Sequence, residues 1–253
     1  MLEQELITSF DTVKELDEFI ASRLIAELQK PGLVLLPVGN TFVKASQASP
    51  GIYPLVNDYF TEGENRLYGS NEEPVLYKEQ HHQVHPGLHL SHLDELVAGK
   101  ISFASQLKSQ LPDVISQCPS FYEIDTGDIE SFEKYIRMAA GPRFILLGLG
   151  ADANAAHVAF MGEEYINSSI DVIKLSDKLA TEHGTQEAVT IGSDIFRMAS
   201  VESIIVVVKG RSKAKSLAAA FADPDTGLGY LIKYCSSKLR IYTDRDAVFE
   251  LKQ

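Results

Sequence analysis

Acidic side chains and a histidine follow two apolar segments of this chain, an arrangement suited to acid–base chemistry. The apolar run that begins at Phe144 breaks into glycines and then delivers Asp152 and His157. A second segment alternates between apolar and polar residues, as a strand does, and ends in the carboxylates Asp94 and Glu95. Open α/β sheets bind ligands at the carboxyl ends of their strands. We therefore expect both groups at one crevice, where partial burial can raise a carboxylate pKa toward neutrality and make a general base.

Two further loops carry groups suited to an anion. Gly39, Asn40 and Thr41 follow an apolar run and offer backbone N–H groups and a hydroxyl. Lys213 is expected in the first turn of a helix, where N–H groups and the helix dipole favour phosphate. Each feature alone is also typical of an ordinary turn or a solvated helix start. The residues alone leave both interpretations open.

Five histidines lie close together in the sequence and could suggest a metal-binding site, but their spacing does not favour one. The cluster consists of His81, His82, His85, His89 and His92. His89 and His92 fall on opposite faces of the expected strand, and no cysteine or HExxH pattern accompanies them. The sequence therefore predicts no metal site, and it predicts no cofactor.

The composition limits the partners of the protein. The 253 residues are 45% hydrophobic and 23% charged, which is ordinary for a globular protein, and the formal charge is −12. This charge disfavours nucleic acid and anionic membranes as partners. Cys118 and Cys235 lack CxxC spacing, no basic segment leads into an apolar one at the start, and no apolar run approaches the ~20 residues that span a bilayer. We expect a cytoplasmic protein, and the sequence leaves open whether it forms a homo-oligomer.

Strand and helix patterns alternate along the chain. Strands are expected at 6–10, 33–38, 87–94, 144–148, 203–208 and 239–243, and helices at 13–28, 53–60, 102–111, 128–140, 213–221 and within 187–200. Such alternation predicts an α/β fold with a doubly wound, mostly parallel sheet and helices on both faces, as in Rossmann-like folds. No linker or repeat divides the sequence, so we expect a single domain over residues 1–253.

The loops, in their order along the chain, resemble the glucosamine-6-phosphate deaminase/isomerase family, which shares its fold with 6-phosphogluconolactonases. The resemblance covers nearly the whole chain. Residues 31–41 resemble the family's strand and sugar-phosphate loop (LPTGGTP or LPTGSTP), 93–96 its MDEY, 147–160 its GxGxDGHIAF, 188–192 its ALTVG and 208–214 its TGxxKA.

The resemblance implies aldose–ketose chemistry on a 2-amino-2-deoxyhexose 6-phosphate, normally with loss of ammonia and without a cofactor. Asp94, the first acid of its pair with Glu95, would move the C2 proton. His157 would help to open the sugar ring, oriented by Asp152 and by a downstream glutamate, Glu163. The phosphate ligands implied by the resemblance are Gly39, Asn40, Thr41, Lys174 and Lys213.

Departures from the family pattern leave alternatives open. The DGH triplet is absent: an insertion of three residues places His157 at the family's histidine, whereas no insertion places Asn154 there. The altered segment 161–164 leaves activity open, and no residue identifies the hexosamine epimer. One alternative is a 6-phosphogluconolactonase, although such enzymes usually carry an arginine directly after the DE pair, where this chain has Leu96. Another is a sugar-phosphate-binding protein with impaired catalysis.

Overall fold

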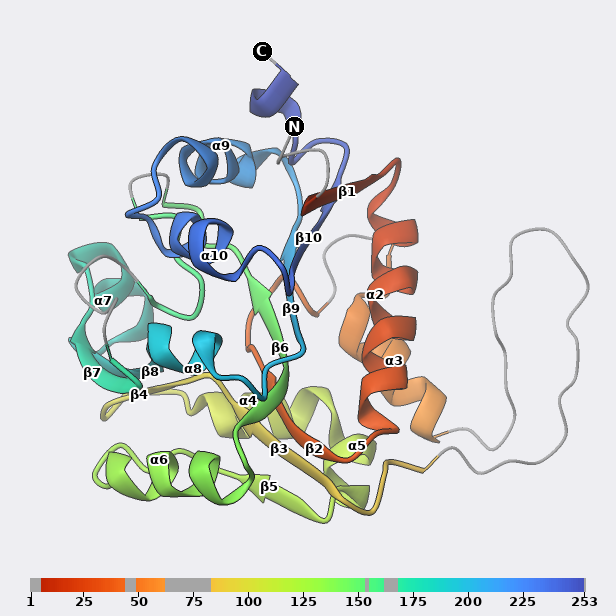
Figure 1. Ribbon diagram of the computed structural model, residues 1–253, viewed down its shortest axis with the longest axis vertical. Helices are drawn as coiled ribbons and strands as arrows, with labels where there is room; N and C mark the ends of the chain where they lie inside the picture. Colours follow the sequence, from red (N-terminus) through yellow and green to blue (C-terminus); the bar gives the residue numbers. More distant parts are fainter. Residues whose placement is uncertain (1–5, 44–48, 62–82, 153–154, 162–167, 253) are drawn as a thin grey trace, which may run out of the picture.

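A seven-stranded parallel sheet forms the centre of the protein. The computed structural model describes residues 6–43, 49–61, 83–152, 155–161 and 168–252 (Figure 1). The sheet order is β1-β10-β9-β6-β2-β3-β5, and every neighbouring pair is parallel. Its strands are β1 (Ile7–Phe10), β2 (Gly32–Leu36), β3 (Leu88–His92), β5 (Ser120–Tyr122), β6 (Pro142–Gly148), β9 (Ser203–Val208) and β10 (Leu239–Asp244).

Helices cover both faces of this sheet. Side chains alternate along β6, so Phe144 and Leu146 pack with the helices of one face and Ile145 and Leu147 with those of the other. The first face carries α2 (Val13–Leu28), α3 (Ile52–Thr61), α4 (Phe103–Gln110) and α5 (Pro112–Gln117). The second face carries α6 (Ile129–Met138), α8 (Ser193–Arg197), α9 (Ala214–Ala222) and α10 (Gly227–Cys235). Figure 1 shows α2 and α3 on one side of the sheet and α9 and α10 on the other.

A second, smaller sheet stands beside the carboxyl end of β3. It contains β4 (Asp94–Leu96), β8 (Glu187–Ile191) and β7 (Ile170–Lys174), paired antiparallel in the order β4-β8-β7. A separate apolar cluster joins this sheet to Phe103 of α4 and to Ala180 of α7 (Asp177–His183). The chain thus passes from the large sheet to the small one between His92 and Asp94.

The predicted doubly wound α/β fold is confirmed, with elements that the sequence analysis did not include. The expected helix near 13–28 begins after Thr12, whose side chain forms a capping box with Glu15. The small sheet, α5, α10 and the short strand β5 were not predicted. Within the described residues, no helix is both long enough and apolar enough to cross a bilayer. The single-domain organisation stays a prediction.

Candidate functional site at the strand ends

The topology predicts a ligand site at the carboxyl ends of β2 and β6. These strands are neighbours, but the chain leaves β2 toward β3 and leaves β6 toward β9, so their loops diverge. A Cβ atom on Gly148 would lie 3.2 Å from the Phe42 ring and 3.5 Å from Thr41 Oγ1. The absence of a side chain at Gly148 therefore lets the loop after β2 cross the end of β6. This contact brings Thr41 to the predicted crevice.

The segment around Gly39, Asn40 and Thr41 is anchored through the start of α3. The buried Tyr53 hydroxyl donates to Pro37 O at 2.6 Å, and the Tyr53 ring stacks on Phe42 with 5.3 Å between centroids. Gly39 has a φ of +136°, which disfavours any residue with a side chain. The expected anion loop is thus held in one shape by its neighbours.

A buried ion pair, which the sequence analysis did not identify, supports the same loop. Lys209 directly follows β9, and its ammonium pairs with the fully buried Asp17 of α2 and donates to Thr41 O. Ser49 Oγ donates to the same Asp17 carboxylate. Burial lowers the pKa of Lys209, and Asp17 opposes this shift. The available signal was a lysine placed directly after an apolar strand.

Asp94 lies at the junction of the two sheets and has the electrostatics of a general base. Thr190 Oγ1 lies 2.6 Å from Asp94 Oδ1, and Thr190 is fully buried on β8. Burial, opposed by the Thr190 hydrogen bond and reinforced by the charge of Glu95, raises the pKa of Asp94 to about 7. The carboxyl group therefore exchanges protons near neutral pH.

His92 holds the backbone of Asp94 in place. This fully buried ring donates from Nδ1 to Asp94 O at 2.7 Å, and its Nε2 accepts from Ile124 N at 2.9 Å. A carbonyl oxygen only accepts and a backbone N–H only donates, so the two contacts specify the neutral tautomer with the proton on Nδ1. Burial accordingly lowers the pKa of His92. His92, one member of the histidine cluster, therefore positions Asp94 by holding the backbone carbonyl of Asp94.

The structure separates the two acids that the sequence analysis paired as catalytic. Side chains alternate along β4, so Glu95 points away from the face that carries Asp94. The buried Glu95 carboxylate accepts from Ser102 Oγ (2.9 Å), Phe103 N (2.8 Å) and Ala104 N (3.1 Å) at the start of α4, where N–H groups otherwise lack partners. The Glu95 carboxylate thus caps the start of α4, and its expected catalytic role stays a prediction.

His157 lies beside the end of β6 in a loop that folds back onto the strand. Gly150 N donates to His157 O at 2.8 Å, and a Cβ on Gly150 would come within 3.2 Å of the His157 Cβ. The half-buried His157 ring donates from Nδ1 to Met161 O at 3.3 Å, so Nε2 carries the lone pair of the neutral ring. Asp152 is exposed in the same loop, and its carbonyl accepts from Ala156 N at 2.8 Å.

The His157 loop has an unusual backbone and a direct link to Asp94. Ala156, Ala159 and Phe160 have φ values of +41°, +49° and +33°, a region that costs free energy for residues other than glycine. Ala159 O lies 3.0 Å from Thr190 Oγ1, the same hydroxyl that contacts Asp94. The structure thus connects Asp94 to the loop that carries His157.

The two predicted phosphate-binding lysines differ in their surroundings. Lys213 ends the 3₁₀ turn Arg211–Lys213 before α9, and burial lowers its pKa, with the nearby Lys178 of α7 adding to the shift and Glu182 opposing it. Lys174 is exposed at the end of β7 opposite Glu187, and strand alternation places it on the face opposite to Thr190. Phosphate binding by Lys174 therefore has less support than binding by Lys213.

Two predicted positions cannot be located in the fold. Glu163, assigned to orient His157, and Asn154, the alternative to His157, lie outside the described residues. Of the histidine cluster, His81 and His82 also lie outside them. Among the described residues, no group of three or more His, Cys, Asp or Glu side chains is arranged to hold a metal ion.

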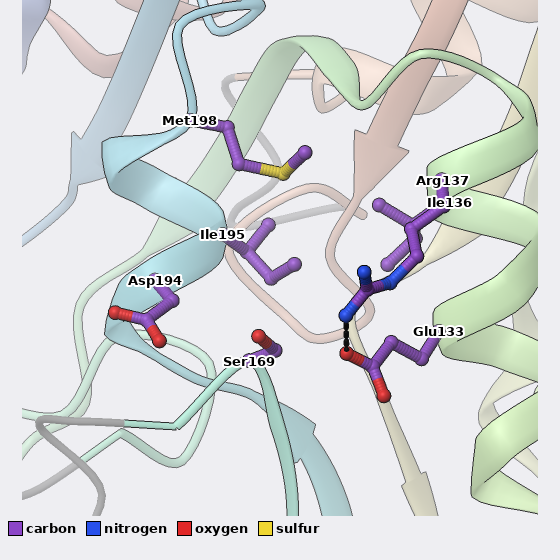
Figure 2. Close-up of a pocket in the computed structure, with 7 residues that line it drawn as sticks. All are labelled: Glu133, Ile136, Arg137, Ser169, Asp194, Ile195 and Met198. Atoms are coloured by element: carbon purple, nitrogen blue, oxygen red, sulfur yellow. Dashed lines mark hydrogen bonds and ion pairs between the residues drawn. The ribbon is translucent and has the colours of Figure 1, made fainter.

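A separate pocket of about 230 Å³ lies between α6 and α8 (Figure 2). Its lining consists of Glu133, Ile136, Arg137, Ser169, Asp194, Ile195 and Met198. Arg137 and Glu133 pair across one turn of α6 at 2.7 Å. The lining includes none of the predicted site residues that the structure describes, so this pocket is distinct from the predicted site at the strand ends.

The raised pKa of Asp94 predicts a pH-dependent loss of stability. Between the ordinary carboxyl pKa of 3.8 and about 7, the folded protein holds a proton that the unfolded chain releases, so Asp94 makes the free energy of unfolding fall as pH rises. The Asp94→Asn variant lacks this titration. Denaturant unfolding of both proteins at pH 4 and pH 8 should show the variant gaining stability relative to wild type with rising pH. A constant difference between the proteins would contradict the raised pKa.

Comparisons with known proteins identify the fold. No protein-family model matches the chain, and no curated protein matches its sequence. A monomeric glucosamine-6-phosphate deaminase superimposes with a TM-score of 0.69 at 17% identity, covering 97% of this chain and 99% of that one. The 6-phosphogluconolactonase from Trypanosoma cruzi gives a TM-score of 0.68 at 13% identity, covering 98% and 97%. The 6-phosphogluconolactonase from Thermotoga maritima gives 0.61 at 16% identity, covering 94% and 97%. The chain therefore has the fold shared by glucosamine-6-phosphate deaminase and the 6-phosphogluconolactonases.

Proposed function

We propose that this protein is an isomerase or deaminase of a 2-amino-2-deoxyhexose 6-phosphate, glucosamine or galactosamine 6-phosphate. The observation that carries the proposal is Asp94, a carboxyl group at the carboxyl end of β3 whose pKa is raised to about 7. A base that must take a proton from carbon and return it works best with a pKa near the operating pH. The fold shared with a glucosamine-6-phosphate deaminase supports the same reaction class.

In the proposed mechanism, His157 first helps to open the sugar ring through Nε2, the ring nitrogen that is not engaged with Met161 O. Asp152 and Glu163 are proposed to orient this histidine. Asp94 then removes the C2 proton from the open-chain aldose and returns it to C1, while one proton passes from the amino group to O1, so that C1 becomes an alcohol and an imine is left at C2. Water hydrolyses the imine to the ketose phosphate and ammonia. Hydrogen-bond donors in the crevice would stabilise the charge that develops on the sugar oxygen.

The phosphate anchors the substrate far from the reacting carbons in this proposal. Backbone N–H groups of Gly39, Asn40 and Thr41 and the ammonium of Lys213 would bind it. Fixing one end of the sugar over Asp94 supplies the orientation that proton transfer requires. The support is the crossing of the Thr41 loop over β6 and the burial of Lys213 beside α9.

Turnover on a small substrate panel tests the proposal. Glucosamine 6-phosphate, galactosamine 6-phosphate and 6-phosphogluconolactone would each be incubated with the protein in deuterated water, and NMR would follow C2 exchange, ketose formation and lactone opening. Exchange at C2 of one hexosamine phosphate is the expected result. Lactone opening without C2 exchange on any hexosamine phosphate would replace the proposal with a hydrolase. Binding without either reaction would indicate a sugar-phosphate-binding protein.

The hydrolase is the second candidate because 6-phosphogluconolactonases superimpose on this chain about as well as the deaminase does. In that reaction a base activates water to attack the lactone carbonyl, and His157 Nε2 would be the corresponding group. Leu96 stands where lactonases usually carry an arginine, which favours the first candidate. The substrate panel separates the two.

Lys213→Ala is expected to weaken binding of the sugar phosphate by roughly 1.5–3 kcal/mol, the range for a hydrogen bond to a charged group. Titration calorimetry with the best substrate, or with its non-reacting alcohol, measures this change. Lys215→Ala, which removes an exposed lysine two residues away on α9, is the matched control and should bind as wild type does. Equal affinity in both variants would remove Lys213 from the site.

A further inference from the structure

The Thr190 hydroxyl has more acceptors around it than it has protons. Its Oγ1 lies 2.6 Å from Asp94 Oδ1 and 3.0 Å from Ala159 O, and the side chain is fully buried between β4 and the His157 loop. A threonine hydroxyl carries one proton and can also accept hydrogen bonds. A backbone carbonyl can only accept. Ile191 O is a third and longer contact at 3.4 Å, so the single Thr190 proton goes chiefly to Asp94 or to Ala159.

The protonation state of Asp94 decides between these two arrangements. An ionised Asp94 has no proton to give, so the 2.6 Å contact requires Thr190 to donate to the carboxylate, and Ala159 O then does not receive the Thr190 proton. A protonated Asp94 can donate to Thr190 Oγ1, which frees the Thr190 proton for Ala159 O. A hydrogen bond from Thr190 to Ala159 O ties the loop to β8, so the second arrangement holds the loop more firmly.

We propose that Thr190 relays the protonation state of Asp94 to the loop 155–161, holding the loop that carries His157 when Asp94 bears the proton and releasing it when Asp94 is ionised. The proposal deepens the proposed function, because it rests on Asp94 cycling as the base. The loop is suited to such a response, since Ala159 and Phe160 hold backbone conformations that need support from their surroundings. Release would coincide with the state of Asp94 that awaits substrate, and retention with the state that has taken the C2 proton.

Other groups around Asp94 can also change their charge with pH, so their effect on the relay has to be considered. They are Glu95 on the same strand, Asp171 opposite Thr190 on β7, His92 on β3 and His157 on the loop, while Glu123 and Lys108 act on His92. Glu95 is held by the start of α4, and the neutral tautomer of His92 is fixed by two backbone contacts. The relay is therefore expected to follow the titration of Asp94 itself.

NMR titration of the substrate-free protein tests the relay. The carboxyl carbon of Asp94 and the carbonyl carbon of Ala159 would be followed from pH 5 to pH 9. In wild type both signals should move with one midpoint. In Thr190→Val, which keeps the shape and removes the hydroxyl, the Asp94 midpoint should rise by roughly 1–2 pH units because the ionised form loses its donor, and the Ala159 signal should no longer follow it.

Three further variants decide between a relay and a merely structural threonine. Thr190→Ser restores the hydroxyl and should restore the shared midpoint. Asp94→Asn, whose amide can donate to Thr190 at every pH, should fix the Ala159 signal at its low-pH position. Thr181→Val, which removes an exposed hydroxyl on α7, should behave as wild type. An Ala159 signal that ignores the titration of Asp94 in wild type would overturn the proposal, whatever the turnover assays show, because no substrate takes part.

Discussion

Replacing Asp94 by asparagine is expected to slow the exchange of the substrate's C2 hydrogen by ~10²–10⁴-fold, the usual contribution of general-base catalysis. Asparagine has nearly the same shape and can keep the contact to Thr190, but it cannot accept the proton. Binding of the sugar phosphate should change little, because its proposed anchors lie elsewhere. The measurement is NMR of C2 exchange in deuterated water, with binding checked separately by calorimetry.

Asp194→Asn is the matched control for that experiment. Asp194 is an acid at the start of α8 and lines the pocket between α6 and α8 (Figure 2). Its replacement should leave C2 exchange unchanged. The reverse result, with exchange lost in Asp194→Asn and kept in Asp94→Asn, would move the active site to that pocket. Undiminished exchange in Asp94→Asn alone would show that another group is the base.

Replacing Lys209 by methionine is expected to lower the free energy of unfolding by ~3–5 kcal/mol, because removing one partner of a buried ion pair leaves the other charge uncompensated. The Lys209 side chain is 7% exposed and that of Asp17 is 0% exposed. Urea unfolding of wild type and variant measures the loss. The double variant Lys209→Met with Asp17→Leu should recover much of it, since neither charge then remains buried.

Lys14→Met is a surface comparison on α2, the helix that also carries Asp17. Lys14 pairs with Glu18 at 3.7 Å, but the Lys14 side chain is 59% exposed and that of Glu18 35%, and such solvent-accessible pairs contribute ~0–1 kcal/mol. An equally small effect at Lys209 would mean that the pair is not buried in solution. Substrate binding by the Lys209 variant is a second measurement, because its ammonium also donates to Thr41 O.

The large sheet could be predicted from the sequence because its strands are continuous apolar runs. The residues of β9, Ser203–Val208, are nearly all buried on both faces, and such runs are typical of parallel strands covered by helices. The starts of three helices could also be predicted, because Thr12, Ser102 and Asp128 are N-cap residues whose side chains each accept a backbone hydrogen bond.

The small sheet could not be predicted, because its strands depend on contacts distant in sequence. β4 has three residues, and β7 (Ile170–Lys174) is an edge strand in which charged residues interrupt the apolar ones. The start of α10 could not be predicted either, because Gly227 and Gly229 are poor helix formers. A Cβ on Gly229 would lie 2.0 Å from Asp223 O, so a close backbone approach requires a glycine in this first turn.

The candidate site was predictable in its loops but not in its supporting contacts. Asp94, Thr41 and His157 follow strands, and the topology brings their segments to one edge of the sheet. The contacts of Thr190, His92 and Lys209 arise from side chains whose partners lie tens of residues away, and local spacing carries no signal for them. Glu95 contacts the start of α4 and does not share a face with Asp94, because side chains alternate along β4.

The position of Asp94 at that turn has a mechanical consequence. Its main chain is held by His92 from the large sheet, and its side chain is held by Thr190 from the small one. A small rotation of one sheet against the other would therefore change the direction in which the carboxylate points, with every residue of the crevice left intact. Substitutions of residues that pack against the small sheet, such as Phe103 or Ala180, can therefore change the orientation of the Asp94 carboxylate without contacting Asp94.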